Sequence, residues 1–195
     1  MNEERIYIIK KSVTFARIDG RFGAFSNMAA NHALYVNDIN IATAEALYQA
    51  CKFPLFPKVQ HEILSQRNPM LAKQCAKKYE HLVRQDWDEI KFRVMRWCLR
   101  VKLIQNWKSF SNVLIDTGDL PIVEYSQKDP VWGAAPDGHG NLKGVNALGR
   151  LLMELRSEID PHHPITKVMP PAINGFLLYG HEIGTVYSPE ILFED

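Results

Sequence analysis

Apolar residues recur at three- and four-residue steps between Trp87 and Asn106, and this run constrains the fold more than any other part of the sequence. Such spacing places side chains on one face of a helix with 3.6 residues per turn. The residues that follow it are Ile90, Val94, Trp97, Val101 and Ile104. The basic residues away from the centre of this stripe are Arg93, Arg96, Arg100 and Lys102. The pattern predicts a long helix with one buried face, which favours a mainly helical core.

Capping and proline signals delimit the other helices. Thr43 is suited to the N-cap of a helix that ends at Phe53, because the residue before Pro54 is pushed away from helical ψ. Proline is tolerated in the first turn of a helix, so Pro57 and Pro69 each mark a start. We expect these helices over residues 43–53, 57–66, 69–78, 109–115 and 147–159.

β-Branched and apolar runs predict only short strands. These are Ile6–Lys11, Val13–Ala16 and Leu120–Tyr125, with a hairpin over Tyr35–Ile41 that turns at Asn37-Asp38. The residues from 132 to 144 are rich in glycine and predict a loop, and those after residue 170 predict short strands packed on the main body. The sequence therefore predicts a mainly α (α+β) single domain with small β elements.

Composition excludes several broad classes of protein. A chain of 195 residues with 46% apolar and 23% charged residues is ordinary for one soluble domain. The net charge of +1 gives no overall attraction to nucleic acid, so a nucleic-acid site would have to be a local basic patch. No apolar run approaches the ~18 residues of a membrane span, and the first residues have no signal-peptide core. We expect a cytoplasmic protein without a membrane partner.

The cysteines do not indicate metal or disulfide chemistry. Cys51, Cys75 and Cys98 are odd in number, widely spaced, and each lies in a segment expected to be helical. No pair has the close spacing of a zinc site, and the histidines show no metal-ligand spacing. We therefore expect buried thiols in a reducing compartment, no metal and no cofactor.

Three polar side chains, Glu45, Gln49 and Lys52, lie on one stripe of the helix that follows Thr43. At about 100° per residue, Gln49 lies roughly 40° from Glu45, and Lys52 about 20° to the other side. Glu45 and Lys52 are about 10 Å apart along the axis, which is longer than the i,i+4 spacing of a surface ion pair. The stripe predicts either a solvated helix face or a carboxylate and an amine that act on one bound molecule.

The glycine-rich segment also has two interpretations. Its glycines free the backbone to approach a ligand, and the helix that begins at Asn146 could receive a phosphate at its first N–H groups. The segment matches neither the Walker nor the dinucleotide pattern, so a structural loop is the alternative. Phe22, Phe25 and Trp132 lie in glycine-containing loops, where rings either stack on a flat heterocycle or pack over a helix end.

Six landmarks occur in an order that resembles one family. They are Gly23-Ala-Phe-Ser-Asn-Met28, Glu45-Ala-Leu-Tyr-Gln-Ala-Cys-Lys-Phe53, Asn68-Pro-Met-Leu-Ala-Lys73, Trp87, Asp129-Pro-Val-Trp-Gly133, and Gly144-Val-Asn-Ala-Leu-Gly-Arg-Leu-Leu-Met-Glu-Leu-Arg156. Together they resemble the NADAR family, also called YbiA-like, over roughly residues 12 to 159. The resemblance implies a YbiA-like fold over residues 1–160, with a C-terminal extension over 161–195 packed on the same domain.

The resemblance implies an N-glycosidic hydrolase. Glu45 matches the family's catalytic glutamate, suited to acid–base work. Lys52 matches its lysine, which can form a Schiff base with a ring-opened ribose once its pKa falls from about 10.4. Holding a phosphate is the alternative role for Lys52. The residues that would bind substrate are Gly23, Phe25, Ser26, Asn27, Gln49, Trp87, Trp132, Gly133, Asp137, Asn146 and Arg150.

Two points of this resemblance bear on the chemistry. Relatives often have an acidic residue directly after Trp-Gly, where this chain has Ala134, and Asp137 is the nearby candidate to replace it. The segment Ala24–Ala29 and the C-terminal region resemble the branch that removes ADP-ribose from the guanine amino group of nucleic acid, as the antitoxin beside a DarT-type toxin. We expect ADP-ribosylated DNA as the substrate. The alternatives are cleavage of phosphorylated ribosylamino-pyrimidine intermediates of riboflavin synthesis, and a non-catalytic ADP-ribose-binding module.

Overall fold

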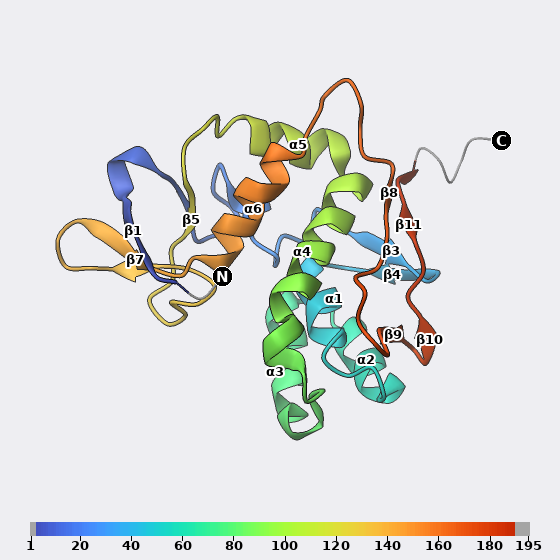
Figure 1. The fold of residues 1–195 in the computed structure, drawn as a ribbon. Coiled ribbons are helices and arrows are strands. Elements are labelled where there is room, and N and C mark those ends of the chain that lie inside the picture. The colour runs from blue at the N-terminus through green and yellow to red at the C-terminus, as the bar shows by residue number, and fades with distance from the viewer. Residues whose placement is uncertain (1–2, 190–195) are drawn as a thin grey trace. The chain divides into compact units, whose positions relative to one another are not determined.

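The computed structural model describes residues 3–189 of the chain (Figure 1). The α-helices within these residues are α1 Ala44–Ala50, α2 Pro57–Leu64, α3 Pro69–Lys78, α4 Trp87–Gln105, α5 Trp107–Ile115 and α6 Ala147–Ser157. Eleven short strands accompany them in the described part of the chain, which confirms the predicted α+β class. The chain forms two compact units, each assembled from two stretches. The first unit holds residues 3–26 and 108–161, and the second holds residues 27–107 and 162–189.

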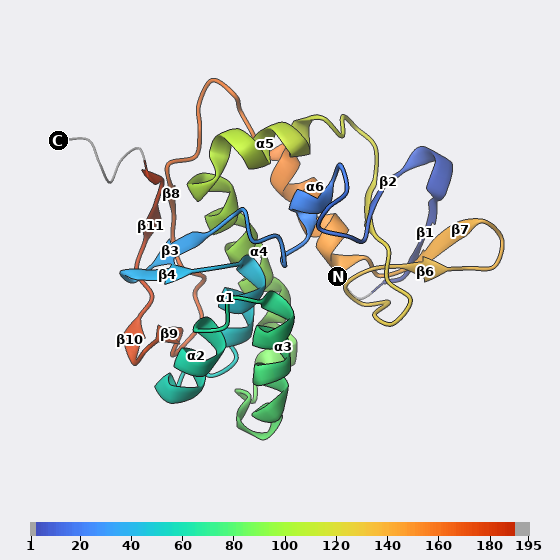
Figure 2. The same ribbon diagram turned by 180° about the vertical axis from the view of Figure 1, so that it is seen from behind.

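Two small sheets and a helix organise the first unit. Strand β1 (Arg5–Ile8) pairs antiparallel with β7 (Asn141–Gly144), which also pairs with β6 (Ala135–Pro136). Strand β2 (Val13–Phe15) runs parallel to β5 (Ile122–Glu124). Helix α6 lies along β5, as Figures 1 and 2 show. Val123 of β5 belongs to a buried cluster with Tyr7, Ala134 and Leu142, and the adjacent Ile122 is also fully buried, so this strand lies in the core of the unit.

A buried asparagine fastens α6 to β5. Asn146 precedes the helix with a left-handed φ of 51° and is fully buried. Its Nδ2 donates to the carbonyl of Ile122 at 2.9 Å, and its Oδ1 accepts from the amide of Glu124 at 3.0 Å. Gly149, one turn later, lies so near the strand that a Cβ there would stand 2.1 Å from the Ile122 carbonyl oxygen. Close packing of this helix on the strand therefore requires both residues.

Helix α4 is the centre of the second unit. Helix α1 and strands β3 (Leu34–Val36), β8 (Lys167–Val168) and β11 (Val186–Tyr187) pack against it. Helices α1, α2 and α3 also pack on one another (Figures 1 and 2). The hairpin of β3 with β4 (Ile39–Ile41) turns at Asn37 and Asp38, whose φ values are 48° and 62°. These left-handed values suit the tight hairpin turn that the sequence predicts.

The C-terminal segment belongs to the second unit. Strand β8 pairs with β11, and β9 (Leu177–Leu178) pairs with β10 (His181–Glu182). The buried side chain of Gln60 on α2 binds this segment twice. It donates to the Leu177 carbonyl at 2.9 Å and accepts from the Tyr179 amide at 2.7 Å. The short strands expected after residue 170 are therefore present up to Tyr187, and residues 190–195 lie outside the described part of the chain.

Three expectations about secondary structure need correction. Much of the glycine-rich segment is a hairpin, because Gly138 and Gly140 take φ values of 80° and 86° between β6 and β7. Residues Ile9–Lys11 form a 3-10 helix and not the end of a strand. Helix α1 ends at Ala50, and residues 51 and 52 form a turn that leads to Pro54.

Lys102 is also placed differently from the expectation that it lies away from the buried face of α4. It is fully buried, one turn after the fully buried Cys98. The buried face of α4 is wider than the predicted stripe, because elements from several parts of the second unit pack around it. Loss of water contact lowers the pKa of Lys102 to about 7.

Replacing Asn146 by alanine is expected to destabilise the fold by roughly 2–4 kcal/mol, because it leaves two backbone groups of β5 without their partners. Urea unfolding followed by circular dichroism measures this change. Asn112→Ala, at an exposed position of α5, is the matched control and should cost less than about 0.5 kcal/mol. Equal unfolding midpoints for the two variants would show that the hydrogen bonds between Asn146 and β5 do not stabilise the fold.

Candidate functional site

Helix α1 carries two buried polar residues of the candidate site. Thr43 caps the helix by accepting from the Ala46 amide at 3.2 Å. Glu45 and Gln49 are only 7% and 4% exposed, and Gln49 Nε2 donates to Glu45 Oε1 at 2.8 Å. The alternative of a solvated helix face is therefore wrong for both residues. This hydrogen bond from Gln49 orients the Glu45 carboxylate.

Lys52 lies in the turn after α1, with its amine against two aromatic rings. Its Nζ is 5.7 Å from the ring centroid of Tyr48 and 5.5 Å from that of Trp87. The two rings lie 5.0 Å apart with an angle of 54° between their planes. Their faces attract a cation, and together they hold the lysine side chain in one place. The backbone carbonyl of Lys52 also accepts from the Arg84 amide at 3.0 Å.

Opposing effects act on the charge of Lys52. Burial is the largest and lowers the pKa of the amine from 10.5. The negative charges of Glu45 and Glu80 raise this pKa, whereas the positive charges of Lys73 and Lys91 lower it. The net direction is downward, which is the direction that a nucleophilic amine requires. Among these charges, Glu45 has the largest effect on the pKa of the amine.

Asn27 lies beside Glu45, and its side-chain oxygen has an unused capacity to accept a hydrogen bond. Its backbone carbonyl accepts from the Glu45 amide at 2.9 Å, and its Nδ2 lies 3.1 Å from the Met95 sulfur. Asn27 is 6% exposed, and its Oδ1 is buried without a hydrogen-bond partner among residues 3–189. Such an atom is costly unless a ligand or water supplies a donor. This makes Asn27 suitable for binding a substrate hydroxyl or amino group.

The other expected residues of the loop after β2 lie in the first unit. Gly23 has a packing role, because a Cβ there would stand 2.1 Å from the Ile18 carbonyl oxygen. Phe25 is fully buried and meets the rings of Phe15 and Phe22 at 5.5 and 5.6 Å. The packing interpretation therefore applies to Phe25, which has no exposed face for a heterocycle. Ser26 ends the 3-10 helix Gly23–Phe25 and is half-buried.

The remaining expected residues also lie in the first unit, around the β6–β7 hairpin. The carboxylate of Asp137 binds the turn itself, accepting from the amides of His139 and Asn141 at 2.7 and 3.0 Å. Its other oxygen accepts from the Asn141 side chain at 3.2 Å. These bonds lower the pKa of Asp137 and occupy both of its oxygens, so it is not a free substitute for an acid at Ala134. Gly133 is buried where a Cβ would stand 2.6 Å from the Glu124 carbonyl oxygen.

The start of α6 does not offer free amides to a phosphate. The amides of Ala147 and Leu148 donate to the carbonyls of Val131 and Trp132, each at 3.0 Å. The side-chain amide of Asn146 is hydrogen-bonded to the backbone of β5. Arg150 follows on α6, half-buried and 3.5 Å from the Glu3 carbonyl, and Trp132 is also half-buried.

The structure thus groups Asn27, Glu45, Gln49, Lys52 and Trp87 within the second unit. Sequence reasoning missed Tyr48, which shares the helix with them and contacts both Lys52 and Trp87. Its position four residues before Lys52 is the signal that could have identified it, since side chains at that spacing meet on a helix. Among residues 3–189, no group of three or more His, Cys, Asp or Glu residues is arranged to hold a metal ion. No helix in the same part of the chain is long and apolar enough to cross a membrane.

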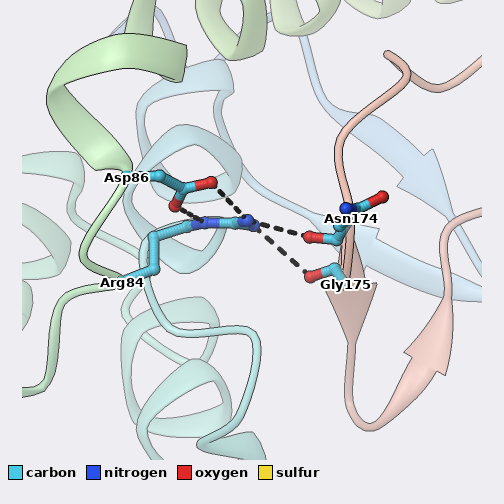
Figure 3. Close-up of polar contacts among 4 residues, drawn as sticks. All are labelled: Arg84, Asp86, Asn174 and Gly175. Carbon is cyan, nitrogen blue, oxygen red and sulfur yellow. Dashed lines mark hydrogen bonds and ion pairs between the residues drawn. The ribbon is translucent and has the colours of Figure 1, made fainter.

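Arg84 connects the Lys52 turn to the C-terminal segment (Figure 3). Its amide binds the Lys52 carbonyl, and its guanidinium forms two bonds to the Asp86 carboxylate at 2.6 and 3.0 Å. The same guanidinium donates to the carbonyls of Asn174 and Gly175 at 2.8 and 3.3 Å. Hydrogen bonding to Arg84 lowers the pKa of Asp86. This pair therefore contributes stability above the ordinary carboxyl pKa of 3.8, and the contribution is lost as pH falls through the lowered value.

Lys52→Met is expected to raise the urea midpoint of unfolding at pH 7. A lowered pKa means that the folded chain holds this proton less tightly than the unfolded chain, so protonated Lys52 destabilises the fold at neutral pH. The gain should shrink as pH rises above the lowered pKa of the folded chain and should vanish above 10.5, where the amine is neutral in both states. Lys58→Met, at an exposed position of α2, should show no such pH dependence. A gain that stays constant from pH 7 to 10.5 would refute this account of Lys52.

Arg84→Ala is expected to increase amide hydrogen exchange across residues 174–178 by about tenfold, because each charged hydrogen bond to a backbone carbonyl contributes about 1.5 kcal/mol or more. Hydrogen-exchange mass spectrometry measures this change. Exchange in β5 of the first unit should stay at the wild-type rate, and Arg67→Ala, at an exposed position, should leave both regions unaffected. Unchanged exchange in residues 174–178 would show that Arg84 does not hold this segment.

Comparison with known proteins identifies relatives over most of the chain. The NADAR domain model matches residues 14–160, close to the range that the sequence landmarks indicate. N-glycosidase YbiA of Shigella flexneri is 36% identical over 147 residues, which cover 75% of this chain and 88% of that protein. The NMR structure of Escherichia coli YbiA superposes with a TM-score of 0.64 at 30% identity, covering 80% of this chain and 94% of that one.

Another relative matches a longer part of the chain. A riboflavin biosynthesis protein of Vibrio vulnificus is 31% identical over 183 residues, which cover 90% of this chain but 48% of that protein. This chain therefore spans about half the length of that relative. The family model, the N-glycosidases and the solved YbiA structure agree on one assignment, and the chain belongs to the NADAR family.

Proposed function

We propose that this protein is an N-glycosidic hydrolase that cleaves the bond between C1 of a ribose and an exocyclic nitrogen. The observation that carries the proposal is the half-buried Lys52 amine, which lies against two aromatic rings and whose pKa burial lowers and the charge of Glu45 raises. A lysine with a lowered pKa beside a buried carboxylate is suited to covalent catalysis with acid–base assistance. The relatives named N-glycosidase support the same reaction class.

The proposed reaction uses both residues. Ring opening of the ribosylamine gives an imine between C1 and the leaving nitrogen. The neutral amine of Lys52 adds to C1, and the bond between C1 and the leaving nitrogen then breaks. The Glu45 carboxylate takes the two protons of the Lys52 amine one after the other and passes them to the leaving nitrogen, which leaves an imine between C1 and Lys52. Water then hydrolyses the Lys52 imine, which releases the sugar and restores the amine. Gln49 would hold the Glu45 carboxylate in place, and Asn27 Oδ1 would accept from a substrate hydroxyl or amino group.

Two substrates fit this chemistry. One is ADP-ribosylated guanine in DNA, with this protein as the antitoxin of a DarT-type toxin encoded nearby. The other is a phosphorylated ribosylamino-pyrimidine of riboflavin synthesis, and relatives named as riboflavin biosynthesis proteins in Vibrio vulnificus and Zea mays support it. The C-terminal extension does not separate this chain from that group. The Vibrio match covers 90% of the 195 residues and therefore extends past residue 160.

The test of substrate is parallel incubation with guanine-ADP-ribosylated DNA and with the riboflavin intermediates, with released sugar measured by mass spectrometry. We expect turnover of one of the two by the wild type. Glu45→Gln should reduce the rate by about 10²- to 10⁴-fold, the usual contribution of a general acid. Binding of ADP-ribose without turnover of either substrate would replace the hydrolase by a non-catalytic binding module.

The role of Lys52 is tested by borohydride reduction during turnover. Wild type should be trapped as a covalent sugar adduct at Lys52, and Lys52→Ala should give none. Lys52→Arg separates the two roles of this residue, since arginine keeps the charge over the rings but is not a nucleophile at neutral pH. Loss of turnover in Lys52→Arg supports the Schiff base, and full turnover would assign Lys52 to phosphate binding. Lys58→Ala is the control for removal of an exposed lysine of the same unit.

A further inference from the structure

The first unit contains a pocket that the reaction proposed above does not use. It measures about 370 Å³, within the range of about 300–1,000 Å³ for small-molecule sites. Its lining combines strand β2, the loop after it, and the residue after β5: Thr14, Phe15, Ala16, Arg17, Gly20, Arg21, Phe22, Gly23 and Tyr125. No carboxylate contributes to this lining, so the pocket is basic and aromatic.

The aromatic side of the pocket is a supported platform. Phe22 stacks on Phe25 with a centroid distance of 5.6 Å and 11° between the ring planes. Phe25 is fully buried and is held edge-on by Phe15 and Phe110 at 5.5 and 6.4 Å. Phe22 itself is half-buried, so part of its surface remains accessible while the packed ring of Phe25 supports it. Such a ring suits stacking with a planar heterocycle.

The basic side of the pocket has one arginine that is already paired and one that is not. Arg17 forms an ion pair with Asp19 at 2.7 Å. The guanidinium of Arg21 lies 5.0 Å from the Phe22 ring centroid and has no carboxylate within pairing distance in residues 3–189. Arg21 is exposed and can rotate away from the ring. A base could then take its place over Phe22 while the guanidinium pairs with a phosphate.

A further feature suits a nucleotide. The Tyr125 hydroxyl accepts from Gln127 at 3.0 Å, which leaves its own proton to donate to a sugar hydroxyl. We propose that this pocket binds a nucleotide, with the base on Phe22, the phosphate on Arg21 and the sugar beside Tyr125.

A base, a sugar and a phosphate occur together in the adenylate part of ADP-ribose and also in a ribosylamino-pyrimidine phosphate. The choice between these two ligands rests on the proposed function. Binding of a purine or a pyrimidine nucleotide distinguishes the two. The residues that carry this proposal, Arg21, Phe22 and Tyr125, are outside the set that the family resemblance implies.

The experiment is titration with AMP, UMP and ribose 5-phosphate, followed by NMR shifts of the Gly20 and Gly23 amides and by calorimetry. We expect a nucleotide to bind, and ribose 5-phosphate to bind at least about tenfold more weakly because it has no base to stack. Arg21→Ala should weaken nucleotide binding by about tenfold, as expected for loss of one charged hydrogen bond. Arg67→Ala, which removes another exposed arginine, should bind as the wild type does. Tighter binding of AMP assigns the purine source, and tighter binding of UMP the pyrimidine source.

Binding is measured apart from turnover, so this proposal and the hydrolase fail in different ways. Lys52→Ala should lose turnover yet keep the affinity for the nucleotide. The pocket is refuted if neither nucleotide shifts the two glycine amides, or if Arg21→Ala binds as tightly as the wild type. It is also refuted if Lys52→Ala, and not Arg21→Ala, abolishes binding. Tyr125→Phe gives a second variant that keeps the ring and should weaken only ligands with a sugar hydroxyl.

Discussion

The buried face of α4 is the constraint on which the second unit depends. Val94, Cys98 and Val101 are fully buried on it, and helix α1 together with three short strands packs against it. None of these strands is longer than three residues, so none is stable by itself. Each is held by its apolar contacts with the helix, and the first residue of the same helix, Trp87, reaches the amine of Lys52.

The candidate site follows from this packing. Because α1 is short and buried, Glu45 and Gln49 are removed from water and bind each other. Lys52, in the turn that follows, loses much of its hydration but contacts two aromatic rings. A cation–π contact contributes about 0.5–1 kcal/mol at an exposed site and about 2 kcal/mol at a buried one. Burial favours the neutral amine, and the rings with Glu45 favour the cation. A side chain under such balanced influences is suited to exchange a proton during a reaction.

Sequence patterns predicted the local structure well where the signal is local. Thr43 caps its helix as expected, and Pro57 and Pro69 begin theirs. Asn37 and Asp38 make the hairpin turn, and α4 covers the predicted range. The roles of individual site residues were less accessible. Gly133 and Asn146 matched a family pattern that implied ligand contact, yet close approach to β5 explains Gly133, and hydrogen bonds to the same strand explain Asn146. A motif cannot distinguish a residue that binds a ligand from one that holds the backbone near it.

The sequence by itself determined the fold class, most helix starts and the stripe of Glu45, Gln49 and Lys52, because capping, proline geometry and helical periodicity act within a few residues. Only the tertiary structure established whether these side chains are exposed to water or buried. Burial of Glu45, the contact of Trp87 with Lys52, and the lowered pKa of that lysine all depend on residues distant in the sequence. Desolvation is a property of everything packed around a group, so no local pattern can encode it.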